Sequence, residues 1–500
     1  MKKTIMQLRG IISFCKLAII MCWIALLVFL LQRDYLVRRL DLHEAQVMEK
    51  AEQENFVGVY LQRQRVGFVK NRMVRRDDGL IQLNQQAILN LTVVGKNYPV
   101  EMAVDARLTP SLLLRDFHFS LSSPFYAMQA RGEVRGNTVQ FVLENGKDEI
   151  RDSVTLTSPP LLSLNQRGYL LTENLRSGDK VKIGYFDPLS LSGKDVLVEY
   201  KGLEKKLVQG RIQLLHHFEE VFSGIRISSW LDDSGKVVME ESPAGFVFVS
   251  EPEFRATSIS RKGADILRNV AVAYDGKLDD IADQPRIAFR LELPEDVHFD
   301  LSGGRQEWQN GIVTIHREKM EFAGGSACAD AAEQLAATPY VQADQAQIMA
   351  LAAEITQGLH RPLDQVRALA GWVFENIEKR PVIGIPDAVT TLATRIGDCN
   401  EHAVLFAALG RSAGIPTRIA AGVTWHEGAF FYHAWNEVCL GGAWVSLDTT
   451  KNQLPADLTH IRFVIGETAE QIRIGALLGQ LRILPVERMD TGEGRDNGTQ

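Results

Sequence analysis

A cysteine in the C-terminal third of the chain stands where a helix is expected to begin. Cys399 follows Asp398, and Glu401 lies three residues after Asp398, which is the spacing of a capping box with Asp at the N-cap. The apolar run 403–409 continues this helix, and Gly414 before Ile-Pro is typical of a helix end. We therefore expect Cys399 to be the first residue of a helix.

That position is suited to a nucleophilic thiol. Unpaired backbone N–H groups and the positive end of the helix dipole favour the thiolate of Cys399 over its thiol. The same N–H groups can stabilise a developing oxyanion. The carboxylate of Asp398 acts in the opposite direction, because a nearby negative charge opposes ionisation of the thiol. A cationic base is therefore needed to restore the balance.

An imidazole and a carboxylate are predicted to meet on one face of a hairpin further along the chain. Two strand-like runs, 430–438 and 443–449, are joined around Gly441-Gly442. If the loop consists of these two glycines, His433 and Asp448 are diagonal neighbours on one face. If the loop starts one residue earlier, they are directly opposed, whereas a three-residue loop would place them on opposite faces.

A thiol, an imidazole and a carboxylate in these roles are the nucleophile, base and orienting group of cysteine acyl transfer. His433 would keep Cys399 ionised and later protonate the leaving amine, and Asp448 would fix the tautomer of His433. His402 remains a rival base, because it lies three positions along the same helix. The sequence contains no Gly-rich phosphate motif, no Cys pair with ligand spacing and no paired His spacing beyond His216-His217. We therefore expect neither a metal nor a cofactor.

Around these residues the sequence resembles the transglutaminase-like superfamily, a papain-related group that includes transglutaminases, peptide N-glycanases and many bacterial proteases and amidases. The resemblance rests on four ordered blocks, Gly397-Asp398-Cys399-Asn400-Glu401-His402, Ala413-Gly414-Ile415-Pro416-Thr417-Arg418, Tyr432-His433-Ala434-Trp435-Asn436-Glu437 and Trp444-Val445-Ser446-Leu447-Asp448. It implies a catalytic triad of Cys399, His433 and Asp448. It also implies an α+β, papain-like domain in which the helix carrying the cysteine packs on an antiparallel sheet.

The resemblance implies attack of Cys399 on a peptide or carboxamide carbonyl, with a thioester that water or an amine then resolves. The broad family pattern favours hydrolysis. Animal transglutaminases use an upstream Trp as an oxyanion donor, but Trp372 lies in a helical pattern that favours core packing.

A catalytically silent envelope module for binding or assembly is the alternative to an enzyme. A lipid or glycan carrier built on the β-rich region is a third possibility, and it requires a large apolar cavity there.

The N-terminal segment has the composition of a membrane anchor. Residues 11–31 are interrupted only by Ser13, Cys15 and Lys16, and as a helix they would reach about 30 Å, the thickness of one bilayer core. The segment ends in Leu-Leu-Gln-Arg rather than in small residues, so we expect it to remain uncleaved. We expect a single-pass protein of the inner membrane with a cytoplasmic N-terminus and a periplasmic body. Its partners would be the membrane and a protein or peptide substrate in the envelope.

The rest of the chain is acidic and long enough for about three domains. Residues 1–40 have a net charge of +6, which leaves −13 for the other 460 of the 500 residues. A body with this charge is not expected to bind nucleic acid.

Turn signals such as Asp78-Gly79 and Gly136-Asn137 separate short runs of alternating apolar and polar residues and predict an antiparallel β-rich domain. We expect a tail and anchor (1–34), a helical stalk (35–54), this β-rich domain (55–257), a linker with a small β module (258–325), the transglutaminase-like domain (326–488) and a disordered tail (489–500).

Three cysteines lie outside the predicted anchor. In an oxidising compartment they permit one disulfide at most, so at least one thiol stays free. Cys439 is either a packing residue or a partner for Cys328. The sequence does not indicate an oligomeric state.

Overall fold

The computed structural model describes most of the chain beyond residue 51. The described residues are 38–39, 52–145, 148–162, 167–171, 174–189, 191–222, 225–257, 270–276, 278, 281, 284–294, 297–320 and 328–486. The predicted anchor (1–34) and the predicted disordered tail (489–500) lie outside this set. Within it, no helix has both the length and the apolar character needed to cross a membrane.

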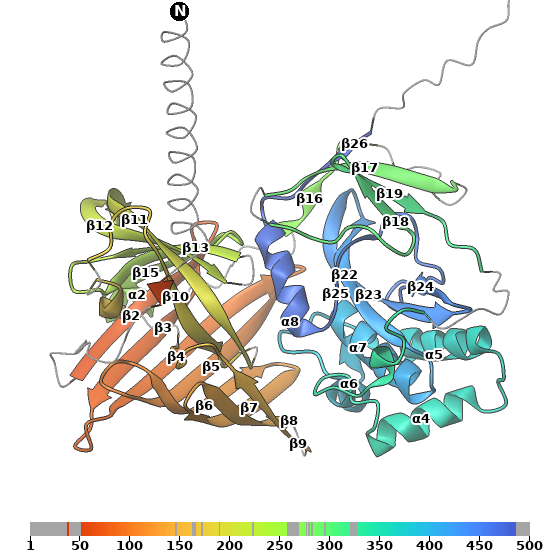
Figure 1. Ribbon diagram of the computed structural model, residues 1–500, viewed down its shortest axis with the longest axis horizontal. Helices are drawn as coiled ribbons and strands as arrows, with labels where there is room; N and C mark the ends of the chain where they lie inside the picture. Colours follow the sequence, from red (N-terminus) through yellow and green to blue (C-terminus); the bar gives the residue numbers. More distant parts are fainter. Residues whose placement is uncertain are drawn as a thin grey trace, which may run out of the picture.

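The N-terminal half forms one 15-stranded sheet, drawn from red to yellow-green in Figure 1. One antiparallel meander comprises β2 (Glu52–Leu61), β3 (Gln64–Arg75), β4 (Ile81–Val93), β5 (Lys96–Leu108), β6 (Leu114–Ser123), β7 (Tyr126–Arg135), β8 (Thr138–Asn145) and β9 (Asp148–Thr155). A second comprises β10 (Lys180–Asp187), β11 (Ser192–Val208), β12 (Arg211–Phe222), β13 (Ile225–Leu231), β14 (Val237–Glu241) and β15 (Phe246–Glu251). Antiparallel pairing of β15 with β2 joins the two meanders, so the prediction of an antiparallel β-rich region is confirmed.

Alternating side chains explain why these runs form strands with one buried face. In β5, Val100, Ala106 and Leu108 are buried, whereas Glu101 and Asp105 are exposed. Successive side chains of a strand point to opposite faces, so this alternation gives the strand one apolar face. The core of the sheet lies on that face.

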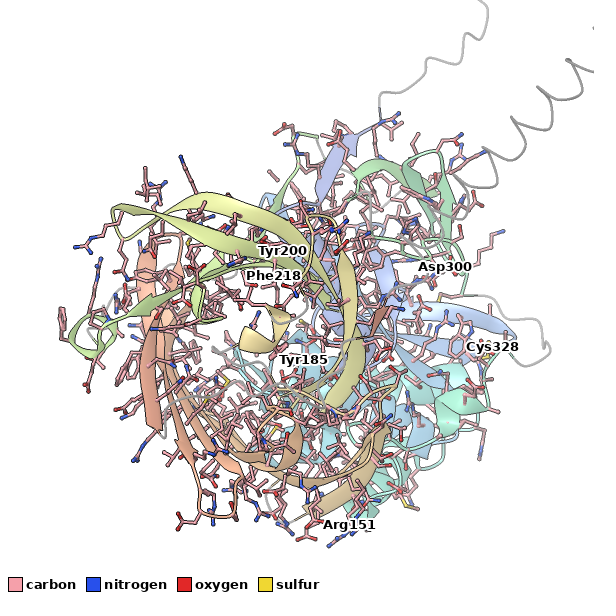
Figure 2. The ribbon with its side chains drawn as sticks, turned by 60° about the vertical axis from the view of Figure 1, so that its left-hand side comes forward. Arg151, Tyr185, Tyr200, Phe218, Asp300 and Cys328 are labelled. Atoms are coloured by element: carbon pink, nitrogen blue, oxygen red, sulfur yellow. A yellow bond between two sulfur atoms is a disulfide. The ribbon has the colours of Figure 1, made fainter. Side chains whose placement is uncertain are left out.

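The sheet curls on itself, and Figure 2 shows Tyr185 inside the curve. Leu161 bridges Leu113 before β6 and Tyr185 in β10, which connects the two meanders a second time. A cavity of about 300 Å³ opens inside the curl, and its lining includes Leu83, Met102, Phe119, Phe186 and Phe248. The β-rich region therefore has an apolar cavity, although its volume is at the lower end of the range for small-molecule sites.

The helical stalk predicted for residues 35–54 is wrong wherever that segment is described. Arg38–Arg39 form β1, which pairs in parallel with β10, and residues 52–54 begin β2. Pairing along a neighbouring strand outweighs the helix propensity of this charged segment. Glu54 is exposed and forms an ion pair with Lys70 on β3, 2.6 Å away, so a charged residue is tolerated on this face.

The small β module predicted within residues 258–325 is joined to the end of the C-terminal domain. Its strands β17 (Arg286–Glu292), β18 (Gln306–Gln309) and β19 (Ile312–His316) form a sheet with β26 (Arg482–Pro485), in the order β18-β19-β17-β26. Its buried side chains, among them Phe289 and Val313, share one apolar cluster with Phe430 and Ile461. The module therefore packs as part of the C-terminal unit, because its strands need apolar partners on that side.

The C-terminal domain has helices on one side of an antiparallel sheet, as Figure 1 shows in cyan and blue. The helices are α4 (Ala346–Thr356), α5 (Pro362–Asn376), α6 (Ala388–Thr394) and α7 (Cys399–Ser412). The sheet has the order β16 (Val272–Ala273), β23 (Ala429–Leu440), β22 (Thr417–His426) and β25 (Ile461–Ile465), and β24 (Ala443–Leu447) also pairs with β23. Helix α7 is central and packs against the other three helices and β23, so the predicted α+β arrangement of a cysteine-bearing helix on an antiparallel sheet is observed.

The β-rich region contacts the segment that leads into α6. Tyr126, at the turn between β6 and β7, packs so closely on Gly384 that a Cβ at residue 384 would overlap its ring. Ile385 is buried within the apolar core of the β-rich sheet. The two halves of the molecule are therefore held together by apolar packing at this point.

A buried ion-pair network inside the curl predicts a large effect of one substitution. Arg167 is 4% exposed and pairs with Glu220 on β12 and with Glu240 on β14, the latter at 2.8 Å. We expect Arg167→Met to lower the free energy of unfolding by about 3 to 5 kcal/mol, because it leaves a buried carboxylate without a partner. Urea denaturation followed by tryptophan fluorescence measures this change.

Arg131→Met is the matched control. Arg131 also pairs with two glutamates, Glu144 and Glu149, but its side chain is 50% exposed. We expect a loss below about 1 kcal/mol, since solvent screens exposed ion pairs. Equal losses in the two variants would contradict the importance of the buried network.

Candidate functional site

The N-terminus of α7 has the predicted capping box. The Asp398 side chain accepts a hydrogen bond from the backbone N–H of Asn400 at 2.9 Å, and the Glu401 side chain accepts one from the N–H of Asp398 at 2.8 Å. Residue 397 must be glycine, because a Cβ there would overlap the Cβ of Glu401. Cys399 is therefore the first helical residue, at a helix N-terminus that is rigidly capped.

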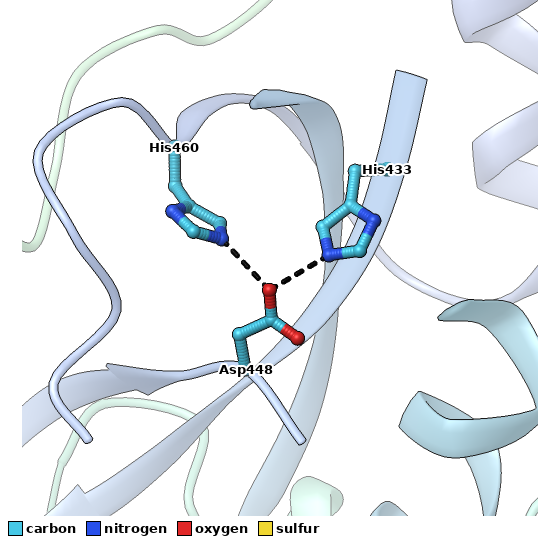
Figure 3. Close-up of side chains that lie close together, drawn as sticks. All are labelled: His433, Asp448 and His460. Atoms are coloured by element: carbon cyan, nitrogen blue, oxygen red, sulfur yellow. Dashed lines mark hydrogen bonds and ion pairs between the residues drawn. The ribbon is translucent and has the colours of Figure 1, made fainter. Parts of the chain in front are cut away.

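The hairpin of β23 and β24 brings His433 and Asp448 together. Leu440 pairs with Ala443, so the loop is the two-residue Gly441-Gly442 and the two side chains are diagonal neighbours. The Nε2 atom of His433 lies 2.8 Å from Oδ2 of Asp448, as the dashed line in Figure 3 marks. Of the registers considered from the sequence, the diagonal one is observed.

Asp448 is fully surrounded by hydrogen-bond donors. It is 1% exposed, and its Oδ1 accepts hydrogen bonds from the backbone N–H groups of Thr450 and Lys451 at 2.8 and 3.1 Å. Burial opposes its charge, but the contacts with His433 and His460 hold the pKa of Asp448 well below its ordinary value. Asp448 is therefore a carboxylate at neutral pH.

Cys399 lies near the part of β23 that carries Ala434, the residue after His433. The backbone N–H of Ala434 favours the thiolate of Cys399, against the larger effect of burial on its pKa. Among the described strands, β16 pairs with residues 429–430 of β23 and β24 pairs with residues 436–440, so the edge between them is open to the cysteine. No hydrogen bond among the described residues joins the Cys399 sulfur to the His433 ring. The thiol thus approaches the strand that carries His433 without a preformed bond to its ring, as is common in unliganded sites.

Burial favours the neutral forms of both groups. It raises the pKa of Cys399 well above its ordinary value, and Asp398 adds to this shift. It also lowers the pKa of His433, although Asp448 acts in the opposite direction. The ion pair of Cys399 and His433 expected from the sequence is therefore opposed in the resting protein, because desolvation penalises both charges. With Nε2–H donating to Asp448, Nδ1 of His433 points away from the carboxylate and can accept a proton (Figure 3).

The two alternative residues considered from the sequence have structural contacts. His402 is fully buried, and its Nδ1 lies 2.7 Å from the carbonyl oxygen of Asp398, so this nitrogen donates within the first turn of α7. Trp372 packs against the helical core, and its ring is covered by the guanidinium of Arg395 at 4.5 Å. These contacts fit packing roles for His402 and Trp372.

His460 is part of the cluster and was missed by the sequence analysis. Its Nε2 lies 3.1 Å from Oδ2 of Asp448, and its Nδ1 lies 3.0 Å from Oδ1 of Asp457 (Figure 3). It belongs to no recognisable motif, because it lies in the loop between β24 and β25. The Asp457-His460 spacing of three residues was the one local signal available.

The same cluster satisfies the spacing of metal ligands. His433, Asp448 and His460 each offer one ligand atom, all within 4.8 Å of one another. The shared carboxylate oxygen already accepts two ring N–H groups, and the positive charge of Lys451 acts on His433. These features fit a hydrogen-bond network better than a cation site, so we assign no metal.

Cys328 and Cys439 form a disulfide. Of the two possibilities for Cys439, the pairing with Cys328 is therefore observed. Cys399 is the free cysteine of the described residues. Disulfides of this kind persist mainly in oxidising compartments.

The shifted pKa of Cys399 predicts the effect of removing its neighbouring charge. Asp398→Asn keeps an N-cap acceptor but removes a negative charge, so the pKa of Cys399 should fall and its thiolate should form at lower pH. We expect faster alkylation of Cys399 by iodoacetamide at pH 8, measured by mass spectrometry. Asp364→Asn, in the first turn of α5, is the matched control and should leave the rate unchanged. A slower or unchanged rate in Asp398→Asn contradicts the proposed effect of this carboxylate.

Comparison with known proteins places this domain in a family. A family model described as the transglutaminase-like superfamily matches residues 349–449. No match was found among curated proteins. Similar solved structures include a predicted cysteine protease from Cytophaga hutchinsonii, with 17% identity, a TM-score of 0.27 and coverage of 40% of this chain and 84% of that chain.

Two further solved structures resemble parts of the chain. The periplasmic domain of TgpA from Pseudomonas aeruginosa has 20% identity and a TM-score of 0.26, with coverage of 34% of this chain and 71% of that chain. A β-barrel-like protein with a domain of unknown function from Brucella abortus has 8% identity and a TM-score of 0.31, with coverage of 40% and 95%. On the evidence of the family model, residues 349–449 form a domain of the transglutaminase-like superfamily.

Proposed function

We propose that this protein performs cysteine-dependent acyl transfer on a peptide or carboxamide carbonyl through a thioester on Cys399. One observation supports the proposal: an imidazole oriented by a buried carboxylate lies on the strand whose Ala434 N–H acts on a free cysteine at a capped helix N-terminus. These are the parts that nucleophilic catalysis by cysteine requires. The match of residues 349–449 to the transglutaminase-like superfamily supports it.

The proposed first step uses His433 as a general base. As the Cys399 sulfur attacks the carbonyl carbon, its proton moves to Nδ1 of His433 and the carbonyl oxygen becomes an oxyanion. Backbone N–H groups at the start of α7 are suited to stabilise that charge. When the carbon–nitrogen bond breaks, the proton on Nδ1 passes to the leaving nitrogen and a thioester remains. Asp448 stabilises the transient imidazolium throughout.

The second step resolves the thioester. A water molecule or an amine gives a proton to His433 while it attacks the carbonyl carbon, and the carbon–sulfur bond then breaks to restore the thiol. Water gives hydrolysis and an amine gives transamidation. Both outcomes need the same three residues, and they differ in how the acceptor side excludes water. We propose hydrolysis as the main outcome.

We also propose that the protein acts in the bacterial envelope, anchored by its N-terminal segment with a periplasmic body. The disulfide between Cys328 and Cys439 supports an oxidising location. The charge of −13 beyond residue 40 supports a protein or peptide substrate rather than nucleic acid. The β-rich region, which contacts the segment before α6, is suited to positioning that substrate.

Thiol labelling tests the catalytic proposal. We expect iodoacetamide to label residue 399 of the native full chain near neutral pH, as located by peptide mapping. His433→Gln should slow labelling by about 100-fold, the lower end of the contribution of a general base. Since burial lowers the pKa of His433, reactivity should persist at neutral pH and decline only below the ordinary histidine value. His426→Gln, at an exposed turn, is the matched control.

Turnover distinguishes the enzyme from the catalytically silent alternative. A peptide library is incubated with the protein and a fluorescent primary amine, then examined by mass spectrometry. Hydrolysis of a carboxamide yields an acid, transamidation adds the mass of the amine, and peptide cleavage yields new termini. Product formation that is lost in Cys399→Ala supports the enzyme. Equal labelling of the wild-type chain and His433→Gln, together with no product, would instead favour a binding or assembly module.

The proposed topology has its own test. We expect protease added to spheroplasts to degrade the body of the protein, because that body would face the periplasm. A version without residues 1–50, expressed in the cytoplasm, should be protected until the cells are lysed. Protection of the full chain in intact spheroplasts would contradict a periplasmic body.

A further inference from the structure

We propose that His460 is a positioning residue, which clamps Asp448 against His433 and limits how strongly Asp448 attracts the proton of His433. This inference rests on the proposed function, because it assigns a role within the same site. It is carried by the shared carboxylate oxygen of Asp448, which faces both imidazole rings (Figure 3). His460 lies beside His433 on the same carboxylate oxygen, with the two ring centroids 5.8 Å apart, so it orients His433 through Asp448.

The clamp leaves the Asp448 carboxylate no freedom to rotate. Its Oδ2 faces Nε2 of His433 at 2.8 Å and Nε2 of His460 at 3.1 Å. Its Oδ1 accepts hydrogen bonds from the backbone N–H groups of residues 450 and 451. Four N–H donors therefore fix one carboxylate, and two of them come from histidine rings that share its Oδ2.

His460 is itself held from behind. Its Nδ1 lies 3.0 Å from Oδ1 of Asp457, and the Trp435 ring covers it edge-on at 5.1 Å. Asp457 is fixed in turn by the backbone N–H of Thr459 at 2.8 Å and by the side-chain amide of Gln453 at 2.9 Å. Hydrogen bonds from His460 and Thr459 hold the pKa of Asp457 below its ordinary value although burial opposes its charge. A carboxylate is therefore present at the far side of the His460 ring.

Both nitrogens of His460 consequently face carboxylate oxygens. A neutral imidazole can donate from only one nitrogen, whereas an imidazolium donates from both. Each nitrogen of the buried His460 ring therefore has a carboxylate acceptor. His460 also lowers the pKa of His433, so it opposes the attraction of Asp448 for the proton of His433.

This electrostatic effect has a functional consequence. His433 must be neutral to accept the proton of Cys399, and His460 favours the neutral form because it lowers the pKa of His433. The charged groups that act on His433 are Asp448 and Lys451, from the segment after β24, and His460, from the loop before β25. Lys379 of β20 (Glu378–Lys379) acts on Asp448. Lys451 and His460 both bind Asp448 and lower the pKa of His433, but Lys451 binds through its backbone N–H, whereas His460 binds through its side chain.

The pH profile of Cys399 alkylation tests this role. Alkylation requires neutral His433, so the rate should fall as the pH decreases through the pKa of His433. His460→Gln keeps one N–H donor for Asp448 but removes the imidazole that lowers the pKa of His433, so that pKa should rise. We expect the acidic limb of the profile to move to higher pH by about one unit, the lower end of the effect of a nearby charge. His426→Gln should leave the limb in place.

Asp457→Asn provides a second variant if His460→Gln folds poorly. It removes the negative charge that faces Nδ1 of His460 while it keeps an acceptor there, so the effect of His460 on His433 should weaken and the limb should move in the same direction by a smaller amount. A lower rate at every pH with an unmoved limb in either folded variant would mean that His460 has only a structural role, and would overturn the inference. Tight stoichiometric binding of Zn²⁺ that requires His460 would also overturn it.

The failure of this inference and the failure of the proposed function have different signatures. If the wild-type profile has an acidic limb that disappears in His433→Gln but does not move in His460→Gln, only the role of His460 is lost. If the wild-type rate does not depend on His433 at any pH, the proposed catalytic function is lost as well.

Discussion

The candidate site depends on one buried negative charge, the carboxylate of Asp448. A carboxylate out of water is costly unless hydrogen bonds replace its hydration, and here two ring nitrogens and two backbone N–H groups do so. Those contacts fix the orientation of His433, and the backbone of the strand that carries His433 also favours the thiolate of Cys399. Without this carboxylate the imidazole would have no defined tautomer, and the thiol would have no oriented base.

The rest of the domain keeps these groups in place. Helix α7 is surrounded by three helices and by β23, so the start of the helix cannot shift without repacking the core. The side-chain amide of Asn436 donates to the carbonyl of Ala403 at 2.9 Å, which ties β23 to the same helix. At the far end of β23, the disulfide to Cys328 attaches the strand to the segment before α4. The open edge of β23 near Ala434 therefore lies in an otherwise rigid domain.

Local patterns were predictable because they depend on neighbours in the chain. The capping box at Asp398 and Glu401 and the antiparallel meanders follow from short spacing rules, and both are observed. The helical stalk and the separation of the small module were not predicted correctly, because β1 pairs with β10 and β26 pairs with β17, both far away in the chain. Propensity within a segment does not reveal such partners.

The sequence by itself determined that Cys399 begins a helix and that a two-residue loop places His433 and Asp448 on one face, because helix capping and strand alternation are local. The tertiary structure decided which of the allowed loops is used, that Cys439 pairs with Cys328, and that His460 shares the carboxylate of Asp448. It also decided the charge balance of the site. Burial depends on the whole fold, and it opposes the ionisation of both Cys399 and His433. The position of Cys399 at a helix N-terminus and the contact of His433 with Asp448 favour that ionisation.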